Sequence, residues 1–272
     1  MYYTDYDYNY AETAVPCRIW FSDESKVVET IIYLGAVQVE KIPRWVAEAC
    51  PPKTAVVHGV PHWYAKDDGS DTSAFTSGYV EAAFNHLAKN YEIKHTVNII
   101  ADSQAVPGVL CLFTRREYVS YVKKIVLLQP LGLNADSFGR TKADRMRVFQ
   151  KRVVQNTSRQ VKELLRDSKL RYNHKLLPKY VNFRSKKTRA QYNAGLQHDS
   201  IPELKKLIKS GKDVVIVCGE KDKIFPPSEI RDNLVRASLD VEMIIVQGIP
   251  HSPSATRFGI ILLKRALDAA AS

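Results

Sequence analysis

The chain has 272 residues, 45% apolar and 10% aromatic, which is enough for one large α/β domain or two small ones with a buried core. No stretch approaches the roughly 18 consecutive apolar residues of a membrane-spanning helix. The tyrosine-rich start, residues 1–10, lacks the basic and apolar regions of a secretory signal. The four cysteines have no CxxC spacing, which argues against a disulfide framework or a zinc site. We therefore expect a cytoplasmic protein that needs no metal or cofactor.

The net charge of +11 is unevenly distributed along the chain. Residues 139–200 contain 17 Lys and Arg but only four acidic residues, a local net charge of +13. The rest of the chain therefore carries a net charge of −2. The protein is a nearly neutral body with one strongly basic segment, and an anionic partner would be attracted to that segment.

Short apolar runs rich in β-branched residues alternate along the chain with stretches of helical spacing. This alternation predicts right-handed crossovers and a doubly wound, mostly parallel sheet with helices on both faces. Chain termini are commonly poorly ordered, although Tyr6, Tyr8 and Tyr10 alternate and could line one face of a strand; we assign no role to the first ten residues. The predicted strands are Cys17–Phe21, Thr30–Leu34, Thr54–Val57, Thr96–Ile100, Lys124–Leu128, Asp213–Val217 and Val241–Val246, and the predicted helices span 39–50, 78–91, 104–118 and 256–270.

One segment interrupts the alternation between Asn134 and Pro202, because its apolar residues follow helical spacing without a convincing strand. We predict an α/β core formed by residues 1–134 and 202–272, and a helical, basic lid formed by residues 135–201. An insertion at this point lies at the carboxyl ends of the strands, which is where open α/β sheets bind their ligands.

A serine follows the predicted strand 96–100, in the sequence Ala101-Asp-Ser-Gln-Ala105. A nucleophilic serine on a sharp strand-to-helix turn needs small residues two positions before and after it, because larger ones would collide with the strand and the helix. Glycine is common at both positions, and alanine meets the demand less fully. Ser103 is therefore a candidate nucleophile, and a plain helix N-cap is the alternative interpretation.

Two later strand ends supply a candidate acid and a candidate base. Asp222 follows the strand 213–217 in a turn that leads into Pro-Pro, and would orient a histidine by accepting its Nδ1–H. Asp136 is a second candidate, and a solvated turn aspartate is the ordinary alternative for either. His251, alone of the seven histidines, lies in the loop after the last strand.

The order Ser103, Asp222, His251, with the serine turn in mid-chain, resembles that of the α/β-hydrolase superfamily. The resemblance covers roughly residues 31–270 apart from the insert, and it points to no single esterase family. It implies that Ser103 attacks an acyl carbonyl, that His251 acts as general base and then as general acid, and that Asp222 orients His251.

The resemblance also implies an oxyanion hole made of two backbone N–H groups. One belongs to Gln104, and the other comes from the loop after the first central strand, from Ala36 or Val37. If the strand assignment is shifted by one element, so that the strand 54–57 takes the place of the strand 30–34, the loop His58–Pro61 supplies the second donor instead. We expect the substrate to contact Gln38, Leu131 and Phe225.

These features favour a serine hydrolase that cleaves a carboxylic ester or thioester of a small-molecule substrate through an acyl-enzyme on Ser103. The same fold and triad could instead carry out C–C bond hydrolysis, peptide hydrolysis or acyl transfer, because a fold does not dictate a reaction. A non-catalytic ligand-binding protein is a further alternative, and the alanines around Ser103 fit it.

The basic segment has three interpretations. It could be a solvated helical surface, or a site for an anionic substrate or anionic lipid headgroup, since Arg suits bidentate contacts to phosphate and carboxylate. Nucleic-acid binding is the third and least favoured, because no known RNA- or DNA-binding module is present. The residues concerned are Arg145, Arg147, Lys151 and Arg152, whose helical spacing allows one shared face, and the cluster Arg184–Arg189.

Overall fold

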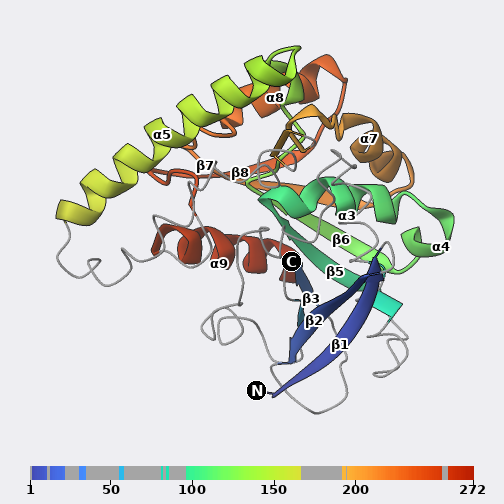
Figure 1. Ribbon diagram of the computed structural model, residues 1–272. Helices are drawn as coiled ribbons and strands as arrows, with labels where there is room; N and C mark the ends of the chain where they lie inside the picture. The colour runs from blue at the N-terminus through green and yellow to red at the C-terminus, as the bar shows by residue number, and fades with distance from the viewer. Residues whose placement is uncertain are drawn as a thin grey trace.

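The computed structural model contains an eight-stranded sheet in the order β1-β2-β4-β3-β5-β6-β7-β8 (Figure 1). Strands β3 to β8 are parallel, and β2 runs antiparallel to both of its neighbours. The structure describes residues 2–10, 13–21, 31–34, 55–57, 81, 84–85, 96–166, 192–193, 195–252 and 257–272. The strands are β1 Tyr2–Tyr10, β2 Thr13–Phe21, β3 Ile31–Leu34, β4 Ala55–Val57, β5 Val97–Asp102, β6 Val122–Leu128, β7 Asp213–Gly219 and β8 Glu242–Val246.

The tyrosine-rich start of the chain forms strand β1. It pairs with β2 along its whole length, from Tyr2 opposite Phe21 to Tyr10 opposite Thr13. Tyrosine favours extended backbone, but the interleaved Asp and Asn residues disfavour it. The long antiparallel partner therefore decides the conformation, and the predicted strand Cys17–Phe21 is the second half of that partner.

The six parallel strands lie where the sequence predicts them, with bounds that differ by at most two residues. All six residues of β5 are buried, as expected for a central strand of a parallel sheet that is covered on both faces. β5 continues to Asp102, two residues beyond its predicted end. The strand therefore runs directly into Ser103.

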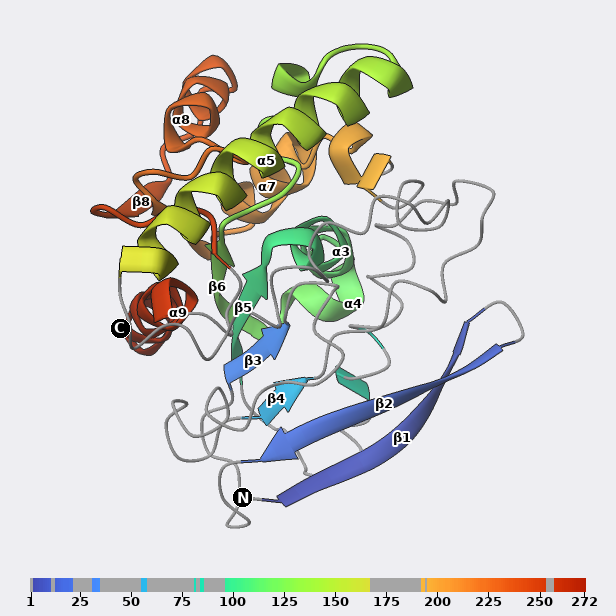
Figure 2. The same cartoon turned by 60° about the vertical axis from the view of Figure 1, so that its left-hand side comes forward.

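Helices cover both faces of the sheet and its carboxyl end (Figures 1 and 2). Helix α9 lies on one side, and α3 and α4 lie on the other. The described helices are η2 Ser103–Ala105, α3 Val106–Phe113, α4 Arg116–Val119, η3 Ala135–Phe138, α5 Lys142–Arg166, α7 Ile201–Lys209, α8 Pro227–Arg236 and α9 Arg257–Ala271.

Successive residues of the central strands pack on opposite faces of the sheet, which creates two hydrophobic cores. Ile100 and Val126 pack with Leu263 of α9 in the smaller core. Ile99 and Ile125 belong to the larger core, together with residues of α3, α7 and α8. The sheet is thus held rigidly between helices, and its carboxyl ends form a fixed platform for the loops that follow.

The single helix predicted over residues 104–118 is wrong, because η2 and α3 run on without a gap but a break after Phe113 separates them from α4. Arg115 has an extended backbone, with φ −77° and ψ 139°, and separates α3 from α4. Just before it, the Thr114 hydroxyl donates to the Cys111 carbonyl at 2.9 Å. Such a local side-chain bond competes with the continuing helical hydrogen bonds. Tyr118 then donates to the Glu81 carboxylate at 2.8 Å, which fixes the new direction of the chain.

The described part of the segment 135–201 contains η3, α5 and the first residue of α7. Its main element is α5, which has 25 residues and crosses the carboxyl end of the sheet (Figure 2). The division of the chain into a core and a lid stays a prediction. No helix within the described ranges is both long enough and apolar enough to cross a membrane.

The end of β7 approaches the loop after β8 so closely that only glycine fits at position 219. A Cβ there would overlap the Ile249 carbonyl oxygen and would lie 2.9 Å from the carbonyl carbon of the same residue. Lys221 N also donates to that carbonyl at 2.9 Å, so the two loops are joined by backbone contacts. These are the loops that carry Asp222 and His251.

We expect Gly219→Ala to lower the free energy of unfolding by about 2–3 kcal/mol, because a backbone carbonyl cannot move aside as a flexible side chain would. Gly211→Ala is the matched control. Gly211 has a φ of 75° but open space around it, so alanine there should cost only about 1 kcal/mol of backbone strain. Urea unfolding of the two variants checks this. Equal losses would show that the approach at Gly219 is not tight.

Candidate active site

Ser103 lies at the junction of β5 and η2 in a strained backbone conformation. Its φ is 52°, a left-handed value that residues other than glycine rarely adopt. Asp102 is the N-cap of η2, and no side-chain capping bond is made. The alternative interpretation of Ser103 as a helix N-cap is therefore wrong. The strained turn between strand and helix is the geometry that exposes a nucleophilic serine.

The turn around Ser103 is held by the loop after β6. Leu131 N donates to the Ser103 carbonyl at 3.2 Å, and the Leu131 side chain is buried. Gln104 follows Ser103 in the first turn of η2. The backbone N–H groups in the first turn of a helix have no carbonyl partner within that helix. A group with this position can bind an oxyanion near Ser103.

Asp222 and His251 form a buried hydrogen-bonded pair. The Nδ1 atom of His251 lies 2.8 Å from Asp222 Oδ2. The other carboxylate oxygen, Oδ1, accepts from Ile224 N and Phe225 N, each at 2.8 Å. When the imidazole donates from Nδ1 to this carboxylate, its neutral form presents Nε2 as a proton acceptor. The pair therefore has the chemistry of a base with a fixed tautomer.

The charges around His251 favour its protonated form. Burial disfavours the imidazolium, but the negative charge and the hydrogen bond of Asp222, with a further contribution from Asp102, outweigh burial and raise the pKa of His251. A base with a raised pKa takes up a proton more readily, which is what the attack of a serine hydroxyl requires. Asp136, the other candidate acid, is not this partner, because its side chain is 81% exposed and faces Arg236 at 3.7 Å.

Asp102 is a second buried carboxylate at this site, and it is not among the site residues predicted from the sequence. Its Oδ2 atom accepts from the Tyr33 hydroxyl at 2.9 Å. Burial raises the pKa of Asp102 from an ordinary 3.8 to about 6, although the Tyr33 bond and the His251 charge oppose the rise. A charged residue inside an otherwise apolar strand end was the signal that could have revealed it.

Two amide side chains hold the His251 loop, and both were missed. Gln129 donates to Ser252 O at 2.9 Å and accepts from Ser252 N at 2.7 Å. Asn156 of α5 donates to the His251 carbonyl at 2.8 Å. Gln129 directly follows β6, a position from which a polar residue reaches the site. Asn156 has no comparable signal, because only the packing of α5 brings it there.

Leu131 and Phe225, expected to contact the substrate, both lie beside the candidate triad. The Phe225 ring meets the His251 ring edge to face, with centroids 5.2 Å apart. On its other side Phe225 packs on Phe138, at 6.0 Å. The wall next to His251 is therefore apolar and aromatic.

Arg145 and Arg152 do not share an exposed basic face with their neighbours, in contrast to the expectation from helical spacing. Arg145 is buried and donates to oxygen atoms within the insert. Arg152 donates two hydrogen bonds to the Glu229 carboxylate, at 2.8 and 2.9 Å. Arg147 is the contrasting case, with a side chain that is 79% exposed. Arg152 thus uses its charge in an ion pair between α5 and α8, where it is not available as part of an exposed basic surface.

Several expected site residues lie outside the described residues. They are Ala36, Val37 and Gln38, the alternative oxyanion loop His58–Pro61, and the basic cluster Arg184–Arg189. Within the described residues, one group of three potential metal ligands occurs, Cys111, His198 and Glu203, and it is separate from the candidate triad.

The ionisation of Asp102 should make the stability of the fold depend on pH. Between about pH 4 and 6 the folded chain keeps a proton on Asp102 that the unfolded chain has released, so stability falls as the pH rises through this window. We expect Asp102→Asn to be more stable than the parent at pH 7, by up to roughly 3 kcal/mol, with the gap closing below pH 6.

Urea unfolding at pH 7 and pH 4 measures this gap. Asp232→Asn, on the exposed surface of α8, controls for the general loss of a negative charge and should show no such trend. A gap of equal size at both pH values would mean that Asp102 does not titrate in this window.

Neither a protein-family model nor a curated protein sequence matches the chain. Solved structures do match it along its whole length. A serine hydrolase involved in carbazole degradation has 16% identity over 99% of each chain and a TM-score of 0.61. An α/β hydrolase from a Medee basin deep-sea metagenome library has 15% identity over 98% of each chain and a TM-score of 0.64. A Rhodococcus esterase has 14% identity over 100% of this chain and 99% of its own, with a TM-score of 0.61. Together with the parallel sheet and its strand order, these likenesses show that the chain has the fold of the α/β-hydrolase superfamily, as its sequence predicted.

Proposed function

We propose that this protein is a serine hydrolase that cleaves a carboxylic ester or thioester through an acyl-enzyme on Ser103. The observation that carries the proposal is the buried Asp222–His251 pair, joined at 2.8 Å, at the same end of the sheet as a serine held at a φ of 52°. Structural costs of this kind, a strained serine and a buried ion pair, concentrate at functional sites.

In the first half of the reaction, Ser103 Oγ attacks the carbonyl carbon of the substrate while His251 Nε2 takes the hydroxyl proton. The negative charge on the carbonyl oxygen is stabilised by Gln104 N–H and by a second N–H, for which Ala36 and Val37 are the proposed sources. The tetrahedral intermediate then collapses. The bond to the leaving alcohol or thiol breaks, and that group takes the proton from His251.

In the second half, a water molecule attacks the acyl-enzyme and gives its proton to His251. Collapse of the new intermediate releases the carboxylic acid, and the proton returns from His251 to Ser103 Oγ. Asp222 accepts hydrogen bonds from two backbone N–H groups and lies 2.8 Å from the imidazole Nδ1. Its part is to hold the tautomer of His251 and to stabilise the imidazolium.

The walls of the site favour an apolar group on the substrate. Leu131 and Phe225 are both buried, and Phe225 covers one edge of the His251 ring. An apolar wall next to the base also excludes water from it, which strengthens the charge interactions that the reaction uses. We therefore propose a small-molecule ester with an apolar acyl or alcohol part as the substrate.

Ser103→Ala tests the nucleophile. We expect it to abolish hydrolysis of a p-nitrophenyl ester and covalent labelling by a fluorophosphonate, because no other group would form the acyl-enzyme. Ser228→Ala, at an exposed position of α8, should keep both activities and serves as the control. Both variants should retain the parent's circular dichroism spectrum. A parent that is not labelled would favour a non-catalytic binding protein with this fold, and full turnover by Ser103→Ala would contradict the assignment.

The acid side of the pH profile tests the electrostatics of the site. His251 must be neutral to act as a base, so kcat/KM should fall as the pH drops through its pKa. Negative Asp102 helps to raise that pKa. Asp102→Asn should therefore shift the acid limb to lower pH, and Asp232→Asn should leave it in place. A shift to higher pH in Asp102→Asn would mean that Asp102 does not act on His251 through its charge.

A further inference from the structure

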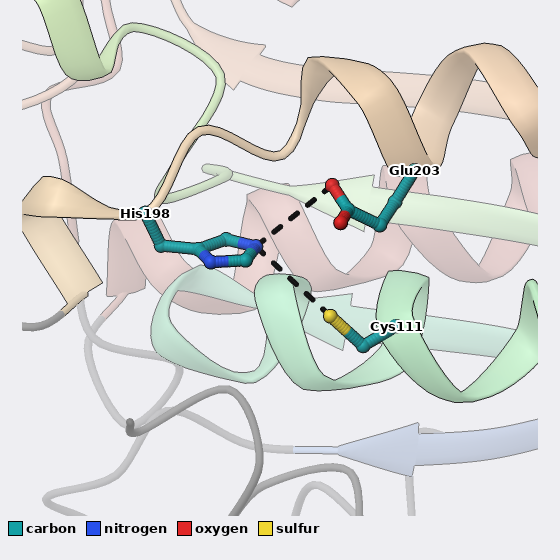
Figure 3. Close-up of side chains that lie close together, drawn as sticks. All are labelled: Cys111, His198 and Glu203. Carbon is teal, nitrogen blue, oxygen red and sulfur yellow. Dashed lines mark hydrogen bonds and ion pairs between the residues drawn. The ribbon is translucent and has the colours of Figure 1, made fainter. Parts of the chain in front are cut away.

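Cys111, His198 and Glu203 come together on the face of the sheet covered by α3 and α7 (Figure 3). Cys111 belongs to α3, His198 lies three residues before α7, and Glu203 is in the first turn of α7. The His198 Nε2 atom lies 4.0 Å from Cys111 Sγ and 3.9 Å from Glu203 Oε2, and faces both of them. We infer that these three side chains form a zinc site, which neither the fold nor the proposed hydrolase reaction requires.

The spacing of the three ligand atoms suits a tetrahedral ion. All three lie within 4.8 Å of one another. With zinc bonds of about 2.0–2.3 Å, ligand atoms around a tetrahedral ion are about 3.3–3.6 Å apart. The two pairs that involve His198 would have to contract by about half an ångström, and the Cys111–Glu203 pair by up to about 1.3 Å, changes that side-chain rotation can supply.

The Glu203 carboxylate supplies an independent indication of a ligand. Its Oε2 atom is buried from solvent and accepts no hydrogen bond within the described part of the chain. The His198 Nε2 atom lies 3.9 Å away, which is too far for a hydrogen bond. A buried carboxylate oxygen without a donor is costly, and a bound ion is one of the ordinary explanations for such an atom.

The donor set selects zinc among the common metal ions. Thiolate and imidazole favour zinc over calcium or magnesium, which prefer oxygen ligands. A thiolate and a carboxylate together neutralise the double charge of the ion. The His198 and Glu203 side chains are 19% and 20% exposed, so an ion can reach the site from solvent, and water can complete its coordination.

The backbone around His198 is fixed before any ion binds. Ser200 N donates to Gly132 O at 3.0 Å, and Ile201 N donates to Asp199 Oδ1 at 3.0 Å. Gly132 has a φ of 92°, and a Cβ there would lie 2.5 Å from Ser200 Oγ, so this approach requires glycine. The ligand segment is thus docked on the loop after β6. A zinc ion would add a direct tie from this segment to α3.

The full-length protein, freed of metal by a chelator and then titrated with Zn²⁺ or Co²⁺, tests the site. We expect one equivalent of either ion to bind. The Co²⁺ form should show a thiolate-to-metal charge-transfer band and the intense visible bands of tetrahedral cobalt. Zn²⁺ should also raise the midpoint of thermal unfolding, because the ion binds the folded chain in preference to the unfolded one.

Variants of the three ligands decide the assignment. Cys111→Ser should remove the charge-transfer band. His198→Gln and Glu203→Gln should each weaken Co²⁺ binding by more than about 100-fold, because loss of a group that only contacts a metal ligand already costs about 10–100-fold. Cys218→Ala is the matched cysteine control. Cys218 is fully buried, and burial raises the pKa of its thiol, so it is not available as a thiolate ligand.

Binding without a thiolate band, a band that persists in Cys111→Ser, or unchanged affinity in Glu203→Gln would each overturn the zinc site. Glu203 is partly exposed, so its variant keeps the test valid even if Cys111→Ser does not fold. None of these measurements uses hydrolysis, so the zinc site and the proposed function stand or fall separately.

Discussion

The hydrogen bond between Asp222 and His251 is the interaction on which the rest of the candidate site depends. A carboxylate removed from water is unfavourable unless donors surround it. Asp222 has three, two from its own turn and one from the imidazole. Because the turn supplies two of them locally, the carboxylate is stabilised as an anion before it meets His251. The charge that raises the basicity of the imidazole is therefore a property of the fold, independent of any substrate.

The same bond explains why so many contacts converge on the loop that carries His251. The loop must reach Asp222 across the end of the sheet, and it is held from three sides. Gly219, at the end of β7, allows a close backbone approach. Gln129, which follows β6, both donates to and accepts from the Ser252 backbone. Asn156 of α5 donates to the His251 carbonyl. An imidazole held in this way loses little freedom on binding a substrate, and preorganisation of this kind is a large part of enzymatic rate enhancement.

The sequence was informative wherever the cause of a structure is local. Buried parallel strands show as apolar runs, and the turns after them are visible in the next few residues, which is why Ser103, Asp222 and His251 could be singled out. Asn156 could not, because its contact with His251 spans 95 residues and follows from the packing of α5. No strand was assigned over β1 for a different reason: its partner β2 follows directly in the chain, but the interleaved Asp and Asn residues disfavour extended backbone.

Two parts of the segment 135–201 contact the backbone of the candidate site. In the second half of α5, the Asn156 side chain donates to the His251 carbonyl. At the end of the segment, Ser200 docks on Gly132, next to Leu131, whose N–H binds the Ser103 carbonyl. A movement of this segment would therefore displace the backbone of both His251 and Ser103. A zinc ion between α3 and the His198 segment would act on the second of these contacts. It would tie the end of the insert to the helix that follows Ser103, and so limit how far the insert can open without displacing the nucleophile.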